Sequence, residues 1–162
     1  TGGFSVYALK NGASKVVSVD LSTDAIEMAN KNAELNGVST NHEGYAVDAF
    51  EYLKNEAINY DVVVLDPPAF AKRRNAIHNA VQGYKRLNMT TLKQMKSGSI
   101  LFTFSCSQAI DMPLFYGTIL SAAILAGKKV RVMHQLSQPA DHPINLFHQE
   151  SSYLKGLVLE VE

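Results

Sequence analysis

Apolar and polar residues alternate along this chain in blocks that predict strands and helices in turn. Compact runs rich in valine, leucine and aromatic residues are typical of strands that are buried in a sheet. Such runs predict strands at 15–20, 44–47, 61–65, 99–105, 128–134 and 153–161, with the second the weakest of the six.

Helices are predicted between these strands, where apolar residues recur at three- and four-residue steps. Ile26, Ala29 and Ala33 give the second helix its apolar face, with Leu35 as a weaker candidate. Ser22 can cap this helix and Gly37 ends it. The pattern predicts helices at 4–10, 22–36, 49–56, 75–95 and 112–126, with Asp111 able to cap the last of them.

This alternation predicts an α/β fold with a mostly parallel sheet and helices on both of its faces. No helix separates the last two strands, so these two can pair antiparallel. Asp20, Asp48, Asp66 and Cys106 lie at or just beyond the ends of four strands. Because ligands bind at the carboxyl ends of strands in such sheets, we expect these four side chains to line one rim.

A nucleoside site is indicated by the first turn and the first two acids. Gly2 and Gly3 precede a helix, where glycine lets a ligand approach the backbone N–H groups, although a plain turn explains them equally well. Asp20 could accept both ribose hydroxyls and Asp48 an adenine amino group, yet either could simply cap the next helix. Together these residues predict a site for a nucleoside with a modified tail.

The most distinctive motif is Asp66-Pro67-Pro68-Ala69-Phe70, which follows a strongly apolar strand. Two prolines hold the backbone extended, so Asp66 would face the reactive end of a cofactor in a fixed geometry. Phe70 could stack on a planar base. A purely structural proline turn is the alternative.

Cys106 ends the next strand and is the chain's one cysteine. It is either an inert core residue or a nucleophile, and the sequence leaves both open. A free thiol has a pKa of about 8.5, so a nucleophile here would need a positive charge or a helix start to assist it. A single cysteine also excludes an internal disulfide, which suits the cytoplasm.

Composition indicates one globular domain of 162 residues, with 46% hydrophobic residues and zero net charge. Residues 67–110 contain no acid and hold seven of the chain's 15 basic residues. This segment indicates an anionic partner or a solvated helix face. The five histidines form no metal-ligand pattern, and no apolar run approaches the roughly 20 residues that span a membrane.

These motifs resemble the class I S-adenosylmethionine-dependent methyltransferases. They are most similar to the bacterial large-subunit ribosomal RNA methyltransferases that make 5-methylcytosine. The specific part is the Asp-Pro-Pro and Ser-Cys-Ser pair, with Asp66 and Cys106 40 residues apart. The matching segments are Thr1-Gly2-Gly3-Phe4-Ser5, Val19-Asp20-Leu21-Ser22, Asn32 with Asn36-Gly37, Asp48-Ala49-Phe50, Asp66-Pro67-Pro68-Ala69-Phe70, Phe104-Ser105-Cys106-Ser107, and Asp141-His142-Pro143 with Tyr153-Leu154-Lys155-Gly156-Leu157.

The resemblance implies a Rossmann-like three-layer sandwich, with residues 1–162 as a partial catalytic domain. This family usually also carries a first strand and an N-terminal RNA-binding domain of the PUA type, and we expect this sequence to be part of a longer protein that contains them. The resemblance further implies S-adenosylmethionine as cofactor and ribosomal RNA as partner. It implies no association with a membrane and is compatible with a homodimer. Implied catalytic residues are Cys106 and Asp66; implied cofactor contacts are Thr1, Gly2, Gly3, Asp20, Leu21, Asp48, Ala49, Asp66 and Pro67; implied substrate contacts are Pro68, Phe70, Lys72, Arg73, Arg74 and Lys85.

Three alternatives stay open at this point. A methylase of an exocyclic amine, such as guanine N2, shares the fold and the Pro-Pro motif but needs no cysteine. A uracil-C5 enzyme also uses a cysteine, but usually continues Cys-Asn-Pro where this chain has Cys106-Ser107-Gln108. A non-catalytic nucleotide-binding module is the third, and binding of S-adenosylmethionine by calorimetry would test it.

Overall fold

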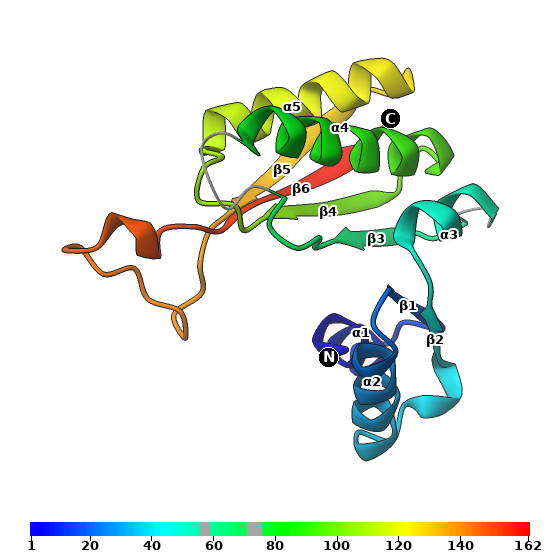
Figure 1. The fold of residues 1–162 in the computed structure, drawn as a ribbon. Helices are drawn as coiled ribbons and strands as arrows, with labels where there is room; N and C mark the ends of the chain where they lie inside the picture. Colours follow the sequence, from blue (N-terminus) through cyan, green and yellow to red (C-terminus); the bar gives the residue numbers. More distant parts are fainter. Residues whose placement is uncertain (56–58, 71–75) are drawn as a thin grey trace. The chain divides into compact units, whose positions relative to one another are not determined.

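The computed structural model describes residues 1–55, 59–70 and 76–162. The chain divides into two compact units, an N-terminal unit (Thr1–Glu56) and a C-terminal unit (Ala57–Glu162), and each is described by itself (Figure 1).

The N-terminal unit is built on two parallel strands. Val16 lies opposite His42 and Asp20 opposite Ala46, so both strands point to the same edge. Its elements are α1 (Gly3–Lys10), β1 (Val16–Asp20), α2 (Thr23–Leu35), the 3-10 turn η1 (Ser39–Asn41), β2 (His42–Ala46) and α3 (Ala49–Asn55).

Helix α2 forms where the sequence predicts it. The Ser22 hydroxyl accepts a hydrogen bond from the Ala25 N–H at 3.3 Å, which satisfies a free donor of the first turn. Ile26, Ala29 and Ala33 of the predicted apolar face are buried, but Leu35, the last residue of α2, is 74% exposed. Gly2 packs against this helix at a φ of +78°, and an added Cβ there would lie 2.9 Å from Ala29. Glycine is therefore required at position 2 both for the turn and for the close approach to α2.

The C-terminal unit holds a four-stranded sheet in the order β3-β4-β6-β5. Strands β3 and β4 are parallel, and β6 runs antiparallel to both of its neighbours. The predicted antiparallel pairing of the last two strands is thus confirmed. The elements are β3 (Val62–Leu65), α4 (Ile77–Gln94), β4 (Ile100–Ser105), α5 (Met112–Ala126), β5 (Val130–Leu136), η3 (Gln149–Ser151) and β6 (Lys155–Val161).

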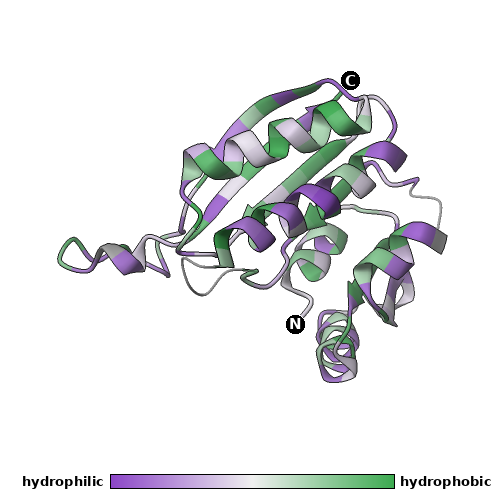
Figure 2. Ribbon diagram, turned by 45° about the horizontal axis from the view of Figure 1, so that its top comes forward, coloured by the Kyte–Doolittle hydropathy of each residue, from purple (hydrophilic) through white to green (hydrophobic). Residues whose placement is uncertain are grey.

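The final strand is inserted between β4 and β5, and it is the most buried strand of the sheet. Helices α4 and α5 lie side by side over one face of this sheet (Figure 1). Their fully buried side chains include Tyr84 and Phe115. The strands of this unit are largely hydrophobic in Figure 2, whereas α4 carries a polar outer side. Asp111 caps α5 as predicted, accepting a hydrogen bond from the Leu114 N–H at 2.8 Å.

Several element ends differ from the prediction. Strand β2 covers His42–Ala46 instead of 44–47, and β5 continues to Leu136. The pairing explains both differences, because His42 lies opposite Val16 and Leu136 lies opposite Gly156. Residue 75, the predicted start of the fourth helix, lies outside the described residues, and α4 is observed from Ile77. None of the helices in the described part of the chain is long and apolar enough to cross a membrane.

Candidate active site

Two predicted catalytic residues leave the C-terminal sheet at the same edge. Strands β3 and β4 are parallel neighbours, with Leu65 opposite Thr103, so the segments that follow them start side by side. The Cys106 thiol lies 3.9 Å from the Pro67 carbonyl oxygen and is oriented to donate to it. The structure therefore brings the cysteine and the Asp-Pro-Pro motif into contact, although 39 residues separate Pro67 from Cys106.

Asp66 lies immediately before this contact. Its side chain reaches solvent, yet the protein around it removes part of the hydration of the carboxyl group. This burial raises the pKa of Asp66 above its usual value of 3.8. A carboxyl with a raised pKa keeps a proton more readily, which suits a group that hydrogen-bonds the ring of a base.

A row of aromatic rings connects the Asp-Pro-Pro motif to the core. The Phe70 ring meets Tyr84 edge-on, with centroids 4.7 Å apart, and Tyr84 meets Phe115 in the same way at 5.8 Å. Gly83 leaves room for the ring, since an added Cβ would lie 3.2 Å from Phe70. These contacts hold the end of the motif on α4. Stacking of Phe70 on a substrate base stays a prediction.

The residue after the cysteine is held from two sides. The Tyr84 and Ser107 hydroxyls lie 3.0 Å apart and share a hydrogen bond. The Lys155 ammonium donates to the Ser107 carbonyl oxygen at 2.6 Å and to the Tyr153 carbonyl oxygen at 2.6 Å. Both Tyr84 and Ser107 are completely buried, so the segment that carries Cys106 has a fixed backbone on its inner side.

Lys155 is a candidate site residue that sequence reasoning did not single out. It begins β6 directly opposite Ser105 and is 8% exposed. Burial lowers the pKa of the Lys155 ammonium, and the nearby negative charges of Cys106 and Asp111 act in the opposite direction. The one available signal was a lysine at the start of an apolar strand, a type of residue that is rarely buried.

The segment between β5 and β6 reaches the same edge of the sheet. Figure 1 shows it extending away from the strands of the C-terminal unit. The Gln108 side-chain amide donates to the Glu150 carbonyl oxygen at 3.1 Å, which ties this segment to the residues after Cys106. Its tip exposes Leu146 and Phe147, at 91% and 94%.

In the N-terminal unit, both predicted nucleoside-binding acids lie at the carboxyl edge of β1 and β2 and are exposed. Asp20 accepts a hydrogen bond from the Ser22 N–H at 2.8 Å. Asp48 accepts from the Phe50 N–H at 2.8 Å and the Glu51 N–H at 3.2 Å. Asp48 therefore caps α3, the structural role that the sequence left open beside adenine binding.

The first turn has an accessible backbone. An added Cβ on Gly3 would meet nothing within 4 Å, in contrast to Gly2. The Thr1 carbonyl oxygen is held by the Asn32 side chain at 2.8 Å, and Leu21 is 73% exposed. Exposed carboxylates beside an open helix start have the right chemistry for ribose hydroxyls and a charged tail. The residues of this unit thus fit a nucleoside cofactor.

The predicted basic contacts are only partly described. Lys85 lies on α4, and Lys96 pairs with Asp61 at 2.8 Å. Lys72, Arg73 and Arg74 lie outside the described residues, so their predicted contacts with an anionic partner stay predictions.

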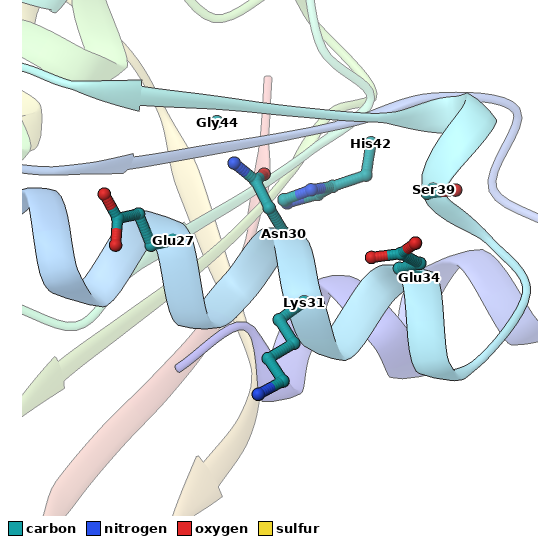
Figure 3. Close-up of a pocket in the computed structure, with 7 residues that line it drawn as sticks. All are labelled: Glu27, Asn30, Lys31, Glu34, Ser39, His42 and Gly44. Atoms are coloured by element: carbon teal, nitrogen blue, oxygen red, sulfur yellow. The ribbon is translucent and has the colours of Figure 1, made fainter.

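A polar hollow in the N-terminal unit lies between α2 and β2 (Figure 3). His42 lines it and shares a 2.8 Å hydrogen bond with the Ser18 hydroxyl. None of the predicted cofactor residues lines this hollow, so it is not the nucleoside site proposed from the sequence. In the described part of the chain, no group of three or more His, Cys, Asp or Glu residues could hold a metal ion.

Comparison with known proteins relates the chain to one enzyme family. Residues 1–145 match the family of S-adenosylmethionine-dependent methyltransferases. Ribosomal RNA large subunit methyltransferase I of Aeromonas hydrophila is 43% identical over 163 residues, covering 98% of this chain and 41% of the relative. The protein of the same name from Vibrio vulnificus is 39% identical over 167 residues, covering 99% and 42%. The chain thus spans about two fifths of the length of these relatives.

Solved structures share the fold at lower identity. A protein from Streptococcus mutans assigned as a SAM-dependent methyltransferase is 22% identical, has a TM-score of 0.82, and covers 97% of this chain and 41% of its own. TrmN from Thermus thermophilus is 16% identical, with a TM-score of 0.66 and coverage of 96% and 40%. These likenesses confirm the predicted Rossmann-like class I methyltransferase fold.

Proposed function

Because this chain belongs to the family of S-adenosylmethionine-dependent methyltransferases, we propose that the whole protein methylates carbon 5 of a cytosine in large-subunit ribosomal RNA. The observation that carries the proposal is the 3.9 Å contact between the Cys106 thiol and the Pro67 carbonyl oxygen. This contact brings Cys106, the proposed nucleophile, next to the Asp-Pro-Pro motif, which we propose holds the cytosine. The family match confirms the predicted cofactor, S-adenosylmethionine.

The relatives support the choice of RNA as substrate. They are named as ribosomal RNA large subunit methyltransferases and align with nearly the whole of this chain. Since the chain covers about two fifths of their length, the proposal concerns the whole protein and not residues 1–162 alone.

The cofactor, when bound, supplies a methyl group on a positively charged sulfur. Asp20 would hold its ribose, Asp48 its adenine, and Gly2 and Gly3 its methionine end. Leu21 and Ala49 would flank the nucleoside. All of these residues lie in the N-terminal unit. Their work is to bind and orient, so that the methyl group is presented to the substrate in a fixed direction.

Carbon 5 of cytosine is a weak nucleophile and needs activation by the enzyme. The Cys106 thiolate forms a bond to carbon 6, and the electron pair of the 5,6 double bond moves to carbon 5. Carbon 5 would then accept the methyl group, whose bond to the cofactor's sulfur breaks and leaves that sulfur neutral. Loss of the carbon-5 proton to a base restores the double bond as the bond from sulfur to carbon 6 breaks and the thiolate returns. Covalent catalysis of this kind divides one hard step into two easier ones.

Asp66 would hold the cytosine while charge builds on its ring. The pKa of its carboxyl group is raised by burial, so it keeps a proton more readily than an ordinary aspartate. A protonated carboxyl could donate to ring nitrogen 3, and an ionised one could accept from the exocyclic amino group. Pro67 and Pro68 fix the direction of both groups.

A base within a duplex is out of reach of a thiol in a protein cleft, so the target must be unpaired or flipped out. Lys72, Arg73, Arg74 and Lys85 would then contact phosphates, and Phe70 would lie near the base.

The decisive experiment traps the adduct. The full-length protein is incubated with S-adenosylmethionine and RNA in which 5-fluorocytosine replaces cytosine. Fluorine at carbon 5 cannot leave as a proton does, so the bond from sulfur to carbon 6 persists. We expect a protein–RNA complex that survives denaturation, with the cross-link mapped to Cys106 by mass spectrometry.

Matched controls separate this reaction from the alternatives. RNA containing 5-fluorouracil would trap a uracil-C5 enzyme instead, and nuclease digestion of methylated RNA would reveal N2-methylguanosine if the target were a guanine amine. Cys106→Ala should form no adduct. Methylation of cytosine with full activity in the alanine variant would rule out the covalent mechanism.

A further inference from the structure

We propose that Lys155 is a positioning residue for Cys106, whose buried positive charge stabilises the thiolate and whose hydrogen bond fixes the backbone that carries it. This inference deepens the function proposed above and rests on Cys106 being the nucleophile. It assigns the required positive charge to the last strand of the sheet, and not to the basic segment or to a helix start.

The register of the sheet puts Lys155 beside the cysteine. Lys155 lies opposite Ser105, the last residue of β4, and its ammonium donates at 2.6 Å to the carbonyl oxygen of Ser107. Cys106 lies between these two contacts. Lys155 therefore pairs through its backbone with the residue before Cys106 and contacts the residue after Cys106 through its ammonium.

A buried ammonium needs negative charge or strong acceptors around it. Lys155 is 8% exposed, and its ammonium donates to the carbonyl oxygens of Ser107 and Tyr153. No carboxylate in the described part of the chain lies within 4.0 Å of this ammonium. A third N–H donor and most of the positive charge thus remain for a nearby anion.

The charges around Lys155 and Cys106 support the role that we propose for Lys155. Burial lowers the pKa of Lys155, and negative charge at Cys106 raises it, ahead of a smaller contribution from Asp111. Negative charge at Cys106 and positive charge at Lys155 attract one another at this edge of the sheet. Further titratable groups at this edge are Asp66 after β3, Tyr84 on α4 and Tyr153 before β6. Glu150 lies in the segment that the Gln108 side chain contacts.

The test measures how fast iodoacetamide alkylates Cys106 in the full-length protein across pH, with mass spectrometry of the Cys106 peptide as readout. Lys155→Gln removes the charge but keeps amide donors for the two carbonyl oxygens. We expect alkylation to be at least about five-fold slower at neutral pH, and its pH profile to move toward alkaline pH, because a positive charge next to the cysteine is lost. Lys155→Arg should stay close to the wild type.

Lys128→Met is the matched control. Lys128 is a half-buried lysine whose ammonium also donates to a carbonyl oxygen, that of Met95 at 2.7 Å. It lies before β5, at the opposite end of the sheet from Lys155. Its replacement should leave the alkylation profile unchanged. A folded Lys155→Gln protein with a wild-type profile would overturn the inference, and so would an equal displacement in Lys128→Met.

A measurement on the wild-type sequence covers the case in which Lys155→Gln does not fold. The ammonium of Lys155 is followed by NMR with labelled lysine, before and after Cys106 is alkylated to a neutral product. Loss of the thiolate should make Lys155 release its proton at lower pH, and an unchanged titration would contradict the inference. If adduct trapping fails while these profiles move as expected, the proposed function fails and the coupling stands.

Discussion

The two units of the molecule prepare their functional residues in opposite ways. In the N-terminal unit, Asp20 and Asp48 are exposed, and each is held by one local turn to N–H groups two or three residues ahead. In the C-terminal unit, the segment of Cys106 is held by Tyr84 and Lys155, which come from other elements and are buried.

This difference suits the role that we propose for each site. Binding ribose hydroxyls requires carboxylates that a ligand can reach, and local turns suffice to aim them. Activating a thiol requires a fixed charge in a poorly hydrated place, which only packed tertiary structure provides. The comparison predicts that changes in the first unit weaken cofactor binding, whereas changes in the second remove turnover.

The largest effect is expected from Cys106→Ala. Without a thiolate to add at carbon 6, methylation of cytosine should fall by about a thousand-fold or more, since the covalent route is lost. Affinity for S-adenosylmethionine, measured by calorimetry on the full-length protein, should stay close to the wild type. A parallel loss of cofactor binding would mean that the two functions are not divided between the units.

The next effect is expected from Asp20→Asn. An amide holds ribose hydroxyls less well than a carboxylate, because charge-assisted hydrogen bonds are about twice as strong as neutral ones. We expect cofactor affinity to fall by about ten-fold, measured by calorimetry. Asp24→Asn is the matched control, an exposed acid in the first turn of α2, and it should bind as the wild type does. Equal losses in both variants would indicate a general effect of charge.

A matched pair of glycine variants tests the first turn. Gly2→Ala places a Cβ 2.9 Å from Ala29 at a φ of +78°, so it should destabilise the protein by about 1–3 kcal/mol in urea unfolding. Gly3→Ala meets open space within a helix and should be neutral or slightly stabilising. If Gly3 lies under the methionine end of the cofactor, Gly3→Ala should still weaken cofactor binding. Unchanged affinity would remove Gly3 from the site.

The smallest effect is expected from Asp66→Asn. The direction in which it changes the melting temperature depends on the raised pKa of Asp66. Because the pKa of Asp66 is raised in the folded protein, the folded state binds more protons than the unfolded chain at pH values just above 3.8. Stability therefore falls as pH rises through this window, up to the raised pKa. Asp66→Asn should melt slightly higher than the wild type at neutral pH, lose that gain well below pH 3.8, and be less active. A lower melting temperature at neutral pH would contradict the assignment.

Most of the elements were predictable because their signals are local. Ser22 and Asp111 cap α2 and α5 as predicted, and Ile26, Ala29 and Ala33 form the buried face of α2. Each of these depends on residues no more than a few positions apart. Element ends were less predictable, since Leu136 extends β5 only through its pairing with Gly156.

By itself, the sequence determined the alternation of strands and helices, the acids at the strand ends, and the Asp-Pro-Pro and Ser-Cys-Ser motifs. Only the tertiary structure decided that the last strand lies between β4 and β5, and hence that Lys155 lies beside Cys106. The hydrogen bond from Lys155 to Ser107 spans 48 residues. Local patterns cannot encode such a contact, because it exists only after distant strands choose their neighbours and their register.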